Sequence, residues 1–303
     1  MWFRNLQLYR LGQRLDLTPE ALGERLQGAA FCGCARLDRT AAGWVSPLGR
    51  DGRQLVHAAN GYLMICARKA DKIIPAGVVK QMLDDKVAAV AAAESREVYR
   101  KERQRMKDDI VVDLLPRALT RHANQYAYFD TRNDLMVVDS PTPARAEALI
   151  SLLRTTLGSF KATPVKVKLA VSHTLTRWLK GERLPPGFAL GEECELKHTD
   201  PDGGVISCRR QDLAAGEVRN HLKNGKYAVR LAIHWKERVS CLLHEDLSLK
   251  RLRFENVIRE GAEAVQGEDP ATRFDLDFSL MTLELNEFTA QLLRALGGEE
   301  APG

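Results

Sequence analysis

The chain has 303 residues, with 45 Lys and Arg against 40 Asp and Glu, and a formal net charge of +5. Its hydrophobic content of 45% and charged content of 28% are ordinary for a globular protein of one large domain or several smaller ones. The six cysteines are too few for a disulfide scaffold, and no apolar run approaches the roughly 20 residues that cross a bilayer. Polar residues interrupt the first eleven positions, which excludes a signal peptide there. We therefore expect free thiols and a cytoplasmic location.

The first 75 residues predict strands, one short helix and a hairpin. Residues 2–11 predict a strand. Thr18 is a good N-cap and Pro19 suits the first helical position, so a short helix is expected to begin there. Short strands are predicted over 43–47, 54–58 and 62–67, and the dipeptide Asn60-Gly61 indicates a hairpin between the last two.

Residues 75–109 predict a single long helix, because apolar residues recur at spacings of three and four. Its second part, ESREVYRKERQRMKDD, is so polar that we expect it to project from the body as a charged arm. The alternative is a solvated helix held by pairs such as Glu97 with Lys101. A second short helix is predicted over 110–119, where Pro116 kinks or ends a turn.

The rest of the chain predicts more hairpins and short helices. Expected elements are a hairpin over 126–139, a helix over 142–157 closed by Gly158, a strand over 165–171, a helix over 174–180, a hairpin of 188–196 with 204–210, a helix over 214–223, strands at 240–244 and 249–254, and two final helices, the last over 280–296. Alternation without a βαβ repeat predicts an α+β fold with mixed, mainly antiparallel sheets. We predict a central unit (1–74 with 120–170), an inserted helical arm (75–119) and a C-terminal unit (171–303).

One stretch, KYAVRLAIHWKERV at 226–239, alternates between an apolar and a cationic face, which is typical of a half-buried strand. The apolar face carries Tyr227, Val229, Leu231, Ile233 and Trp235, and the cationic face carries Lys226, Ala228, Arg230, Ala232, His234, Lys236 and Arg238. Residues 209–253 hold eleven Lys and Arg against five Asp and Glu, whereas 255–303 hold three against eleven. Such segregation indicates a polyanion partner, although a solvated strand is the alternative.

Motifs of catalysis are absent from the sequence. It has no phosphate-binding glycine loop, no H-E-x-x-H, no G-x-S-x-G, and no histidine at metal spacing from a Cys or another His. Asp275 and Asp277 would form a metal site only if they shared the face of a strand. We therefore predict no enzyme, no cofactor and no metal. Cations on a sheet contact phosphates without reading sequence, and Tyr227 and Trp235 on the opposite face disfavour stacking of single-strand bases.

Several blocks in order along the chain resemble a known family. They are MWFRNLQLYRL, ICARKADKIIP, LLPRAL, ALISLLRTTLGS, LTRWL, DGGVISCRRQDL, NHLKNGK, LKRLRF, RFDLDFSLM and LGGE. Over essentially its whole length the chain resembles the bacterial recombination-associated RdgC family. This resemblance implies a ring-shaped homodimer of the nucleoid with a positively charged hole, which binds double-stranded DNA with little sequence preference, binds single-stranded DNA more weakly, and restrains the recombinase RecA. It implies no catalytic activity and no cofactor.

The resemblance also assigns residues. The family block important for DNA contact or ring closure corresponds here to Arg209, Arg210, Gln211 and Asp212, and Leu119 stands where the family often has Phe at a dimer contact. With the basic strand, the predicted DNA-binding residues are Arg209, Arg210, Gln211, Lys223, Lys226, Arg230, Lys236, Lys250 and Arg251.

Two alternatives stay open beside this non-enzymatic DNA binder. One is an interaction protein that contacts RecA directly through the charged arm at 94–107. The other is a metal-dependent nuclease that uses Asp275 and Asp277. Whether DNA threads through a closed ring or enters through a gate also stays open.

Overall fold

The computed structural model describes residues 1–49, 52–200, 202–255 and 269–300. Its strands are β1 (Leu6–Leu11), β2 (Thr40–Val45), β3 (Val56–Ala59), β4 (Tyr62–Ile73), β5 (Leu119–Asp130), β6 (Leu135–Asp139), β7 (Ala162–Pro164), β8 (Phe188–His198), β9 (Val205–Arg209), β10 (Lys226–Trp235), β11 (Val239–His244) and β12 (Leu249–Phe254). They form one sheet in the order β2-β4-β5-β6-β1-β12-β11-β10-β8-β9, with β3 beside β4 and β7 beside β1. All named pairs are antiparallel, which confirms the predicted fold class.

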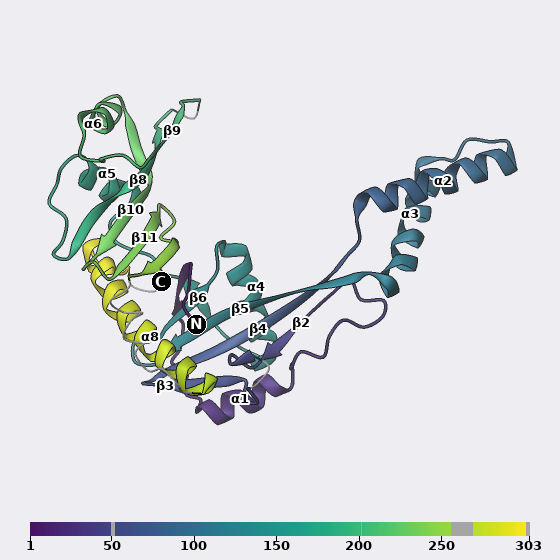
Figure 1. Cartoon of the computed structure of the whole chain (residues 1–303), viewed down its shortest axis with the longest axis horizontal. Helices are drawn as coiled ribbons and strands as arrows, with labels where there is room; N and C mark the ends of the chain where they lie inside the picture. Colours follow the sequence, from purple (N-terminus) through teal and green to yellow (C-terminus); the bar gives the residue numbers. More distant parts are fainter. Residues whose placement is uncertain (50–51, 201, 256–268, 301–303) are drawn as a thin grey trace.

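Helices flank this sheet (Figure 1). In the described parts they are α1 (Pro19–Gln27), α2 (Ala76–Glu94), α3 (Arg100–Leu114), α4 (Pro143–Leu157), α5 (Val171–Leu179), α6 (Gly216–Lys223) and α8 (Pro270–Ala295), with a 3-10 turn, η2 (Leu115–Arg117). None of these helices combines the length and the apolarity that crossing a bilayer requires.

The apolar residues pack into two cores. In the first, α1 and α4 place Leu22 and Leu149 against one face of the N-terminal strands. In the second, α8 covers the opposite face of those strands and continues, with α5 and α6, over one face of the C-terminal strands. Successive side chains of the N-terminal strands, such as Met64 and Ile65 of β4, therefore enter different cores, because both faces of that half of the sheet are covered.

Helix α8 joins the two halves of the sheet, which share a single register pair, Leu6 with Leu249. At one end Phe278 packs edge-on against Tyr128 of the N-terminal half. Further along, Phe288 packs against Trp235, whose indole N–H donates to Gln291 at 2.9 Å. The sequence-based division into three units stays a prediction.

Several local signals are confirmed. The Thr18 hydroxyl accepts a hydrogen bond from the Ala21 N–H at 3.2 Å, so the predicted N-cap begins α1. Asn60 and Gly61 have φ angles of 51° and 79°, which form the tight turn between β3 and β4. Gly158 ends α4 with a φ of 77°. Residues such as Gly and Asn adopt positive φ readily, which explains why these boundaries could be located from sequence.

Residues 75–119 differ from the prediction. Two helices, α2 and α3, replace the single long helix, because Ser95 adopts a left-handed φ of 51° and Tyr99 precedes a new first turn. Glu97 therefore lies outside a helix, so the expected pair with Lys101 is wrong, and Arg96 pairs with Glu102 at 2.8 Å instead. Residues 110–114 continue α3, and Pro116 lies in η2. Figure 1 shows both helices at the far end of the long β4–β5 ribbon.

Other boundaries were also predicted wrongly, including the end of β4, which runs to Ile73, and the start of β5, which lies at Leu119. No named strand covers 165–171 in the described structure: Val167 makes an isolated bridge with Glu299, and Val171 begins α5. The basic strand ends at Trp235, since Lys236 and Glu237 take φ angles of 50° and 54° in the turn to β11. The last helix begins at Pro270 rather than near 280, and the helix expected before it falls largely on 256–268, outside the described residues.

Candidate nucleic-acid interface

Strand β10 has one buried side and one side that no helix in the described structure covers. Leu231, Ile233 and Trp235 are each at most 1% exposed and belong to the core beneath α5, α6 and α8. Between them Ala232 and His234 point to the opposite side, and Arg230 pairs in register with Glu195 of β8 and His244 of β11. We call this uncovered side of β8 to β12 the open face. The alternation of buried Leu231, Ile233 and Trp235 with Ala232 and His234 confirms the predicted pattern for this part of β10.

The alternation fails at the start of β10. Register shifts between β10 and β8 mark an irregularity between Ala228 and Arg230, and Ala228 rather than Val229 packs in the helix-covered core. The Ala228 N–H donates to the Thr176 hydroxyl of α5 at 2.9 Å, which satisfies a donor that a regular ladder would have paired with a strand. The predicted faces of Lys226, Tyr227, Ala228 and Val229 are therefore wrong, because a single extra residue reverses every side chain before it.

Carboxylates of β8 hold several of the predicted cations. Glu193 lies 2.6 Å from Arg251 and 3.8 Å from Arg209, and Glu195 pairs with Arg230. These acids lie before residue 209, so a charge count over 209–253 misses them. The open face is therefore less positive than the sequence alone indicates, and part of its arginine charge is neutralised within the sheet.

Four arginines nevertheless surround a shallow cavity of about 380 Å³ on the open face. Arg209 and Arg210 come from the end of β9, and Arg251 and Arg253 come from β12. The cavity, which we call the arginine hollow, is also lined by Glu192, Glu193, Ala232, Ile233, His234, Ser240, Cys241 and Leu242. Arg210 and Arg253 make no side-chain ion pair or hydrogen bond with any residue that the structure describes. Four guanidinium groups against two carboxylates make this hollow an anion-attracting site.

The structure brings only part of the predicted set to this hollow. Arg209, Arg210 and Arg251 line it, and Arg230 and Lys250 lie on the same sheet face near His244. The Lys226 ammonium donates to the Gly204 carbonyl at 2.6 Å. The other predicted residues lie elsewhere: Gln211 donates to Glu217 on α6, Lys223 is exposed at the end of α6, Lys236 pairs with Glu287 on the helix-covered side, and Leu119 is at the distant start of β5.

Two residues of the hollow, Arg253 and His234, are missing from the predicted set. Arg253 pairs in register with Ser240 of β11, which in turn faces His234 of β10. The sequence LKRLRF could have indicated Arg253, because Arg253 stands between Leu252 and Phe254, which are both buried. Arg251 and Arg253 are two residues apart, so the period of a strand places both on the same face. The φ of 51° at Arg251 marks the irregularity between β12 and β11, which lets the adjacent Lys250 lie on that face as well.

His244 is half-buried beneath the cations of the open face. Burial lowers the pKa of its imidazole to about 4, aided by the positive charges of Lys250, Arg230 and Arg251 and opposed by Asp246. Between pH 6.5, the usual pKa of histidine, and about pH 4, His244 is therefore protonated in the unfolded chain and neutral in the folded chain. Folding stability is expected to fall as the pH falls through this window.

This pH dependence is a direct test of the environment of His244. We expect the free energy of unfolding in urea to decrease from about pH 7 to about pH 5, and the decrease to be smaller in His244→Gln. His221→Gln on α6 is the matched control and should retain the wild-type pH dependence. An identical pH dependence in wild type and His244→Gln would contradict the assignment.

The two acids considered for a metal site lie on α8 and have different partners. Asp275 lies 3.0 Å from the His57 Nε2 atom on β3, whereas Asp277 contacts the amino group of Met1 at 2.5 Å. They share a helix and not the face of a strand. No group of three or more His, Cys, Asp or Glu side chains with metal-site geometry occurs within residues 1–49, 52–200, 202–255 and 269–300.

Comparison with known proteins decides the family. The family model described as "Putative exonuclease, RdgC" matches residues 1–299. This chain belongs to the RdgC family. It is 43% identical over 300 residues to the Recombination-associated protein RdgC of Aeromonas hydrophila, and 42% identical over 299 residues to that of Yersinia pestis, in each case over 99% of both chains. The RdgC resemblance inferred from the sequence blocks is confirmed, and the chain is a recombination-associated protein of that family.

Proposed function

We propose that this protein is a non-enzymatic, sequence-nonspecific binder of duplex DNA that acts as a homodimer and restrains RecA in recombination. The observation that carries the proposal is the arginine hollow on the open face, backed by a rigid sheet whose other side is sealed by α5, α6 and α8. Guanidinium groups bind phosphate oxygens with paired hydrogen bonds, and such contacts carry no sequence information.

The open face favours the backbone of a duplex over the bases of a single strand. No Trp, Tyr or Phe lines the arginine hollow, whereas single-strand binding sites use aromatic side chains as stacking platforms. Of the two aromatic residues of β10, Trp235 is fully buried against α8, and Tyr227, at the start of the strand, does not line the hollow. Phosphate contact is therefore the interaction that this set of side chains offers.

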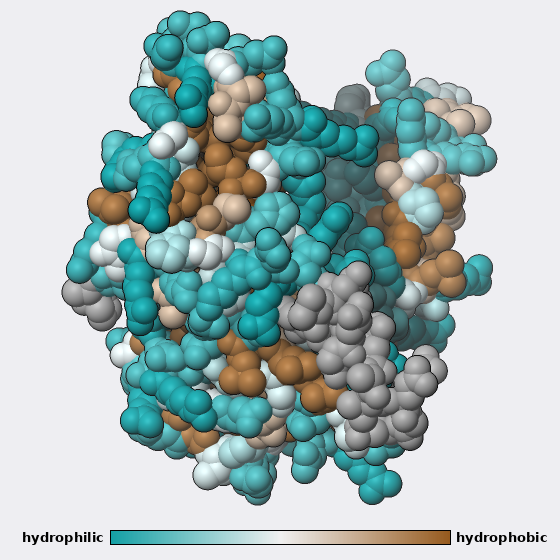
Figure 2. Space-filling view, turned by 60° about the vertical axis from the view of Figure 1, so that its left-hand side comes forward, coloured by the Kyte–Doolittle hydropathy of each residue, from teal (hydrophilic) through white to brown (hydrophobic). Residues whose placement is uncertain are grey.

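A homodimer is supported by the apolar side chains at the other end of the chain. We call α2, α3, η2 and the adjoining ends of β4 and β5 the tip, which Figure 1 shows far from the open face. Exposed apolar residues concentrate at or near this tip: Leu37, Ile73, Val78, Met82, Tyr99, Val112 and Leu119, with Leu119 79% exposed. Figure 2 shows hydrophobic residues on this part at the right of the view. Exposed apolar clusters of this kind mark interaction surfaces.

Two curved chains that meet at both ends would enclose a hole, and the open faces would line part of it. Figure 1 shows the C-terminal strands at one end of the curve and the tip at the other. In this arrangement Leu119 contributes to the contact between the two tips, and the arginine hollows supply cationic surface for DNA.

Salt dependence and DNA topology together test the proposal. The logarithm of the binding constant for a short duplex should fall linearly with the logarithm of salt concentration, by about 0.9 per phosphate contact. Binding should vary little between duplexes of unrelated sequence. Linear and covalently closed circular duplexes compete equally if the ring opens, and linear duplex wins if DNA must thread. An affinity that is insensitive to salt would overturn the proposal.

The description of the family model favours a nuclease as the second candidate. End-labelled duplex incubated with the protein and Mg²⁺ or Mn²⁺ should remain intact if the protein is not an enzyme. Reproducible cleavage that disappears in Asp275→Asn with Asp277→Asn would instead establish a nuclease.

Direct contact with RecA through 94–107 is tested by charge reversal of Arg100 and Lys101 in α3. Loss of RecA inhibition with unchanged DNA affinity would favour that contact.

A further inference from the structure

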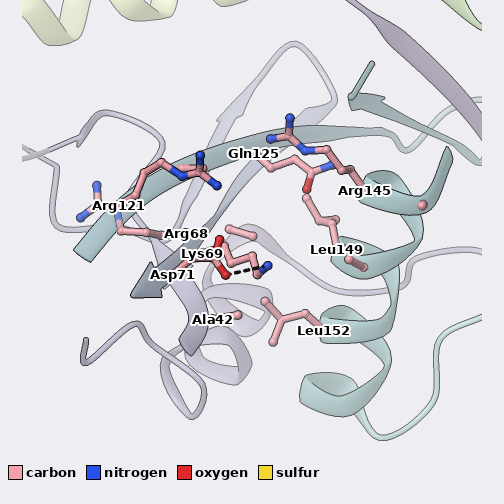
Figure 3. Close-up of a pocket in the computed structure, with 13 residues that line it drawn as sticks. Ala42, Arg68, Lys69, Asp71, Arg121, Gln125, Arg145, Leu149 and Leu152 are labelled. Atoms are coloured by element: carbon pink, nitrogen blue, oxygen red, sulfur yellow. Dashed lines mark ion pairs between the residues drawn. The ribbon is translucent and has the colours of Figure 1, made fainter. Parts of the chain in front are cut away.

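A second and larger cavity lies between α4 and the N-terminal strands, away from the arginine hollow. It has a volume of about 750 Å³ and is bounded by β2, β4 and β5 on one side and by α4 on the other (Figure 3). We call it the α4 pocket. It opens where α4 and the β4–β5 ribbon separate, just beyond the core that Leu149 and Ala67 help to form.

Small apolar side chains form the floor of the α4 pocket. Seven of its thirteen lining residues are alanine or leucine: Ala42, Ala67, Ala123, Ala144, Ala148, Leu149 and Leu152. Alanines on three strands and on the facing helix leave space that a larger aliphatic side chain from another molecule would fill. No aromatic residue lines the pocket, so it has no platform for stacking a nucleobase.

Cationic side chains surround this apolar floor. Lys69 comes from β4, Arg121 from β5 and Arg145 from the first turn of α4. Arg68 is also in the lining, but its side chain turns to the other face of the β4–β5 ribbon, where it lies over the ring of Phe31. The one acid, Asp71, pairs with Lys69 at 2.9 Å, which leaves an excess of two positive charges, those of Arg121 and Arg145.

Two of these arginines are available to a ligand. Arg68 donates to Asn124 at 2.9 Å, whereas neither Arg121 nor Arg145 makes a side-chain hydrogen bond or ion pair within the described residues. Figure 3 shows Arg121 and Arg145 on different sides of the pocket. The amide nitrogen of Gln125, also in the lining, is buried without an acceptor among the described residues. A ligand that brings acceptor oxygens would satisfy this donor and both guanidinium groups.

We propose that the α4 pocket binds an acidic peptide segment of a partner protein, with an aliphatic side chain on the alanine and leucine floor and carboxylates on Arg121 and Arg145. Charge complementarity selects the acidic peptide, and the apolar, non-aromatic floor selects aliphatic side chains over bases. A nucleic acid would satisfy the arginines but would leave the floor exposed to water. The inference does not depend on the DNA-binding role of the open face.

Fluorescence anisotropy of the full-length protein with three labelled probes tests this assignment. The probes are an acidic peptide of Asp and Glu with two adjacent leucines, the same peptide with serines in place of the leucines, and a thymidine oligonucleotide. We expect the leucine peptide to bind at least about tenfold more tightly than the serine peptide, because burial of one large aliphatic side chain is enough for that ratio. Equal affinity of the two peptides would overturn the proposal.

Variants separate the floor from the rim. Ala148→Trp fills the pocket from an exposed position of α4 without changing charge, and it should weaken the leucine peptide at least about tenfold. Arg121→Glu with Arg145→Glu should weaken both peptides. Arg14→Glu with Arg25→Glu, two exposed arginines outside the pocket, is the matched charge control and should bind like wild type.

Other occupants of the α4 pocket give different results in the same experiments. If the oligonucleotide displaces the leucine peptide and loses affinity in Ala148→Trp, the pocket belongs to nucleic acid. If Ala148→Trp instead changes the oligomeric state in sedimentation, the occupant is a second copy of this chain. Either result overturns the assignment to a partner peptide, and neither affects the salt-dependence test of the open face.

Discussion

Reversing the charge of Arg210 and Arg253 together is expected to weaken duplex binding at least about tenfold near 0.1 M salt, and to make its salt dependence shallower by about 1.8 log units per log unit of salt. Both residues line the arginine hollow, and neither has a carboxylate partner in the described part of the chain. Their full charge is therefore available to phosphate. The variant Arg210→Glu with Arg253→Glu is to be compared with wild type by anisotropy titration on a short duplex at several salt concentrations.

The control for this experiment carries the same change in net charge elsewhere. Arg14→Glu with Arg25→Glu reverses two exposed arginines in and near α1, on the N-terminal half of the chain. If binding depends only on net charge, both variants lose the same affinity and the hollow has no special role. If the hollow binds phosphate, only the first variant changes the slope.

Removing the charge of a carboxylate on β8 is expected to change duplex affinity in the opposite direction. Glu193 neutralises Arg251 at 2.6 Å and Arg209 at 3.8 Å. Glu193→Gln keeps the shape of the side chain and releases both guanidinium groups, so duplex affinity should increase. In the wild type these exposed arginines must leave their ion pairs with Glu193 when DNA binds. The cost is small, because exposed ion pairs contribute little stability. An unchanged affinity would place the DNA away from β8.

The sequence predicted the open face better than it predicted the charge on it. Alternation from Leu231 to Trp235 located the buried and open sides of this part of β10 correctly, since burial imposes period 2 on a strand. The carboxylates that neutralise Arg209, Arg230 and Arg251 come from β8, which is distant in sequence from β12. Strand order is a property of the whole sheet, so a local count of charges could not reveal these pairs.

The tip shows the same limit for helices. Apolar spacing predicted helical structure over 75–109, and two helices are present there. The chain reverses between them through Ser95, which adopts a left-handed conformation without being Gly or Asn. Neither spacing nor composition signals such a turn, because Ser is also a common helix-boundary residue in ordinary conformations. The arrangement of α2 against α3, and the apolar surface that it exposes, could therefore be found only from the structure.

The α4 pocket could not be predicted from sequence for a different reason. Its cationic side chains, Lys69, Arg121 and Arg145, come from segments that lie far apart in the sequence. Only the pairing of β4 with β5, in which Lys69 faces Ala123, and the placement of α4 beside them bring these residues together. The arginine hollow, in contrast, draws on a region that is basic in sequence.

Replacing Leu119 by Asp is expected to weaken the proposed homodimer at least about tenfold, because an exposed leucine that becomes buried on association contributes roughly 1.5–3 kcal/mol. Leu119 is 79% exposed at the start of β5, next to η2. Its side chain is free to enter an apolar site on a second tip, and a charged side chain there would have to be desolvated. Sedimentation velocity over a range of protein concentrations measures the change in dimer dissociation.

Two further variants make this prediction specific to the tip. Leu119→Phe adds apolar area at the tip, so the dimer should become tighter. Leu283→Asp replaces another exposed leucine, 51% exposed on α8 and away from the tip, and should leave dimerisation unchanged. Equal dissociation of Leu119→Asp and Leu283→Asp would show that the tip is not the contact.

The same variants connect the dimer to DNA binding. If the tips close the ring, Leu119→Asp opens one end of it, and covalently closed circular duplex should then bind as rapidly as linear duplex of the same length. Leu119→Phe should slow the binding of circular duplex but not of linear duplex, because the contact between the tips opens less often while the arginine hollow is unchanged. Affinity for a short linear duplex should remain close to wild type in Leu119→Phe. Loss of linear-duplex affinity in that variant would mean that Leu119 contacts DNA and not a second chain.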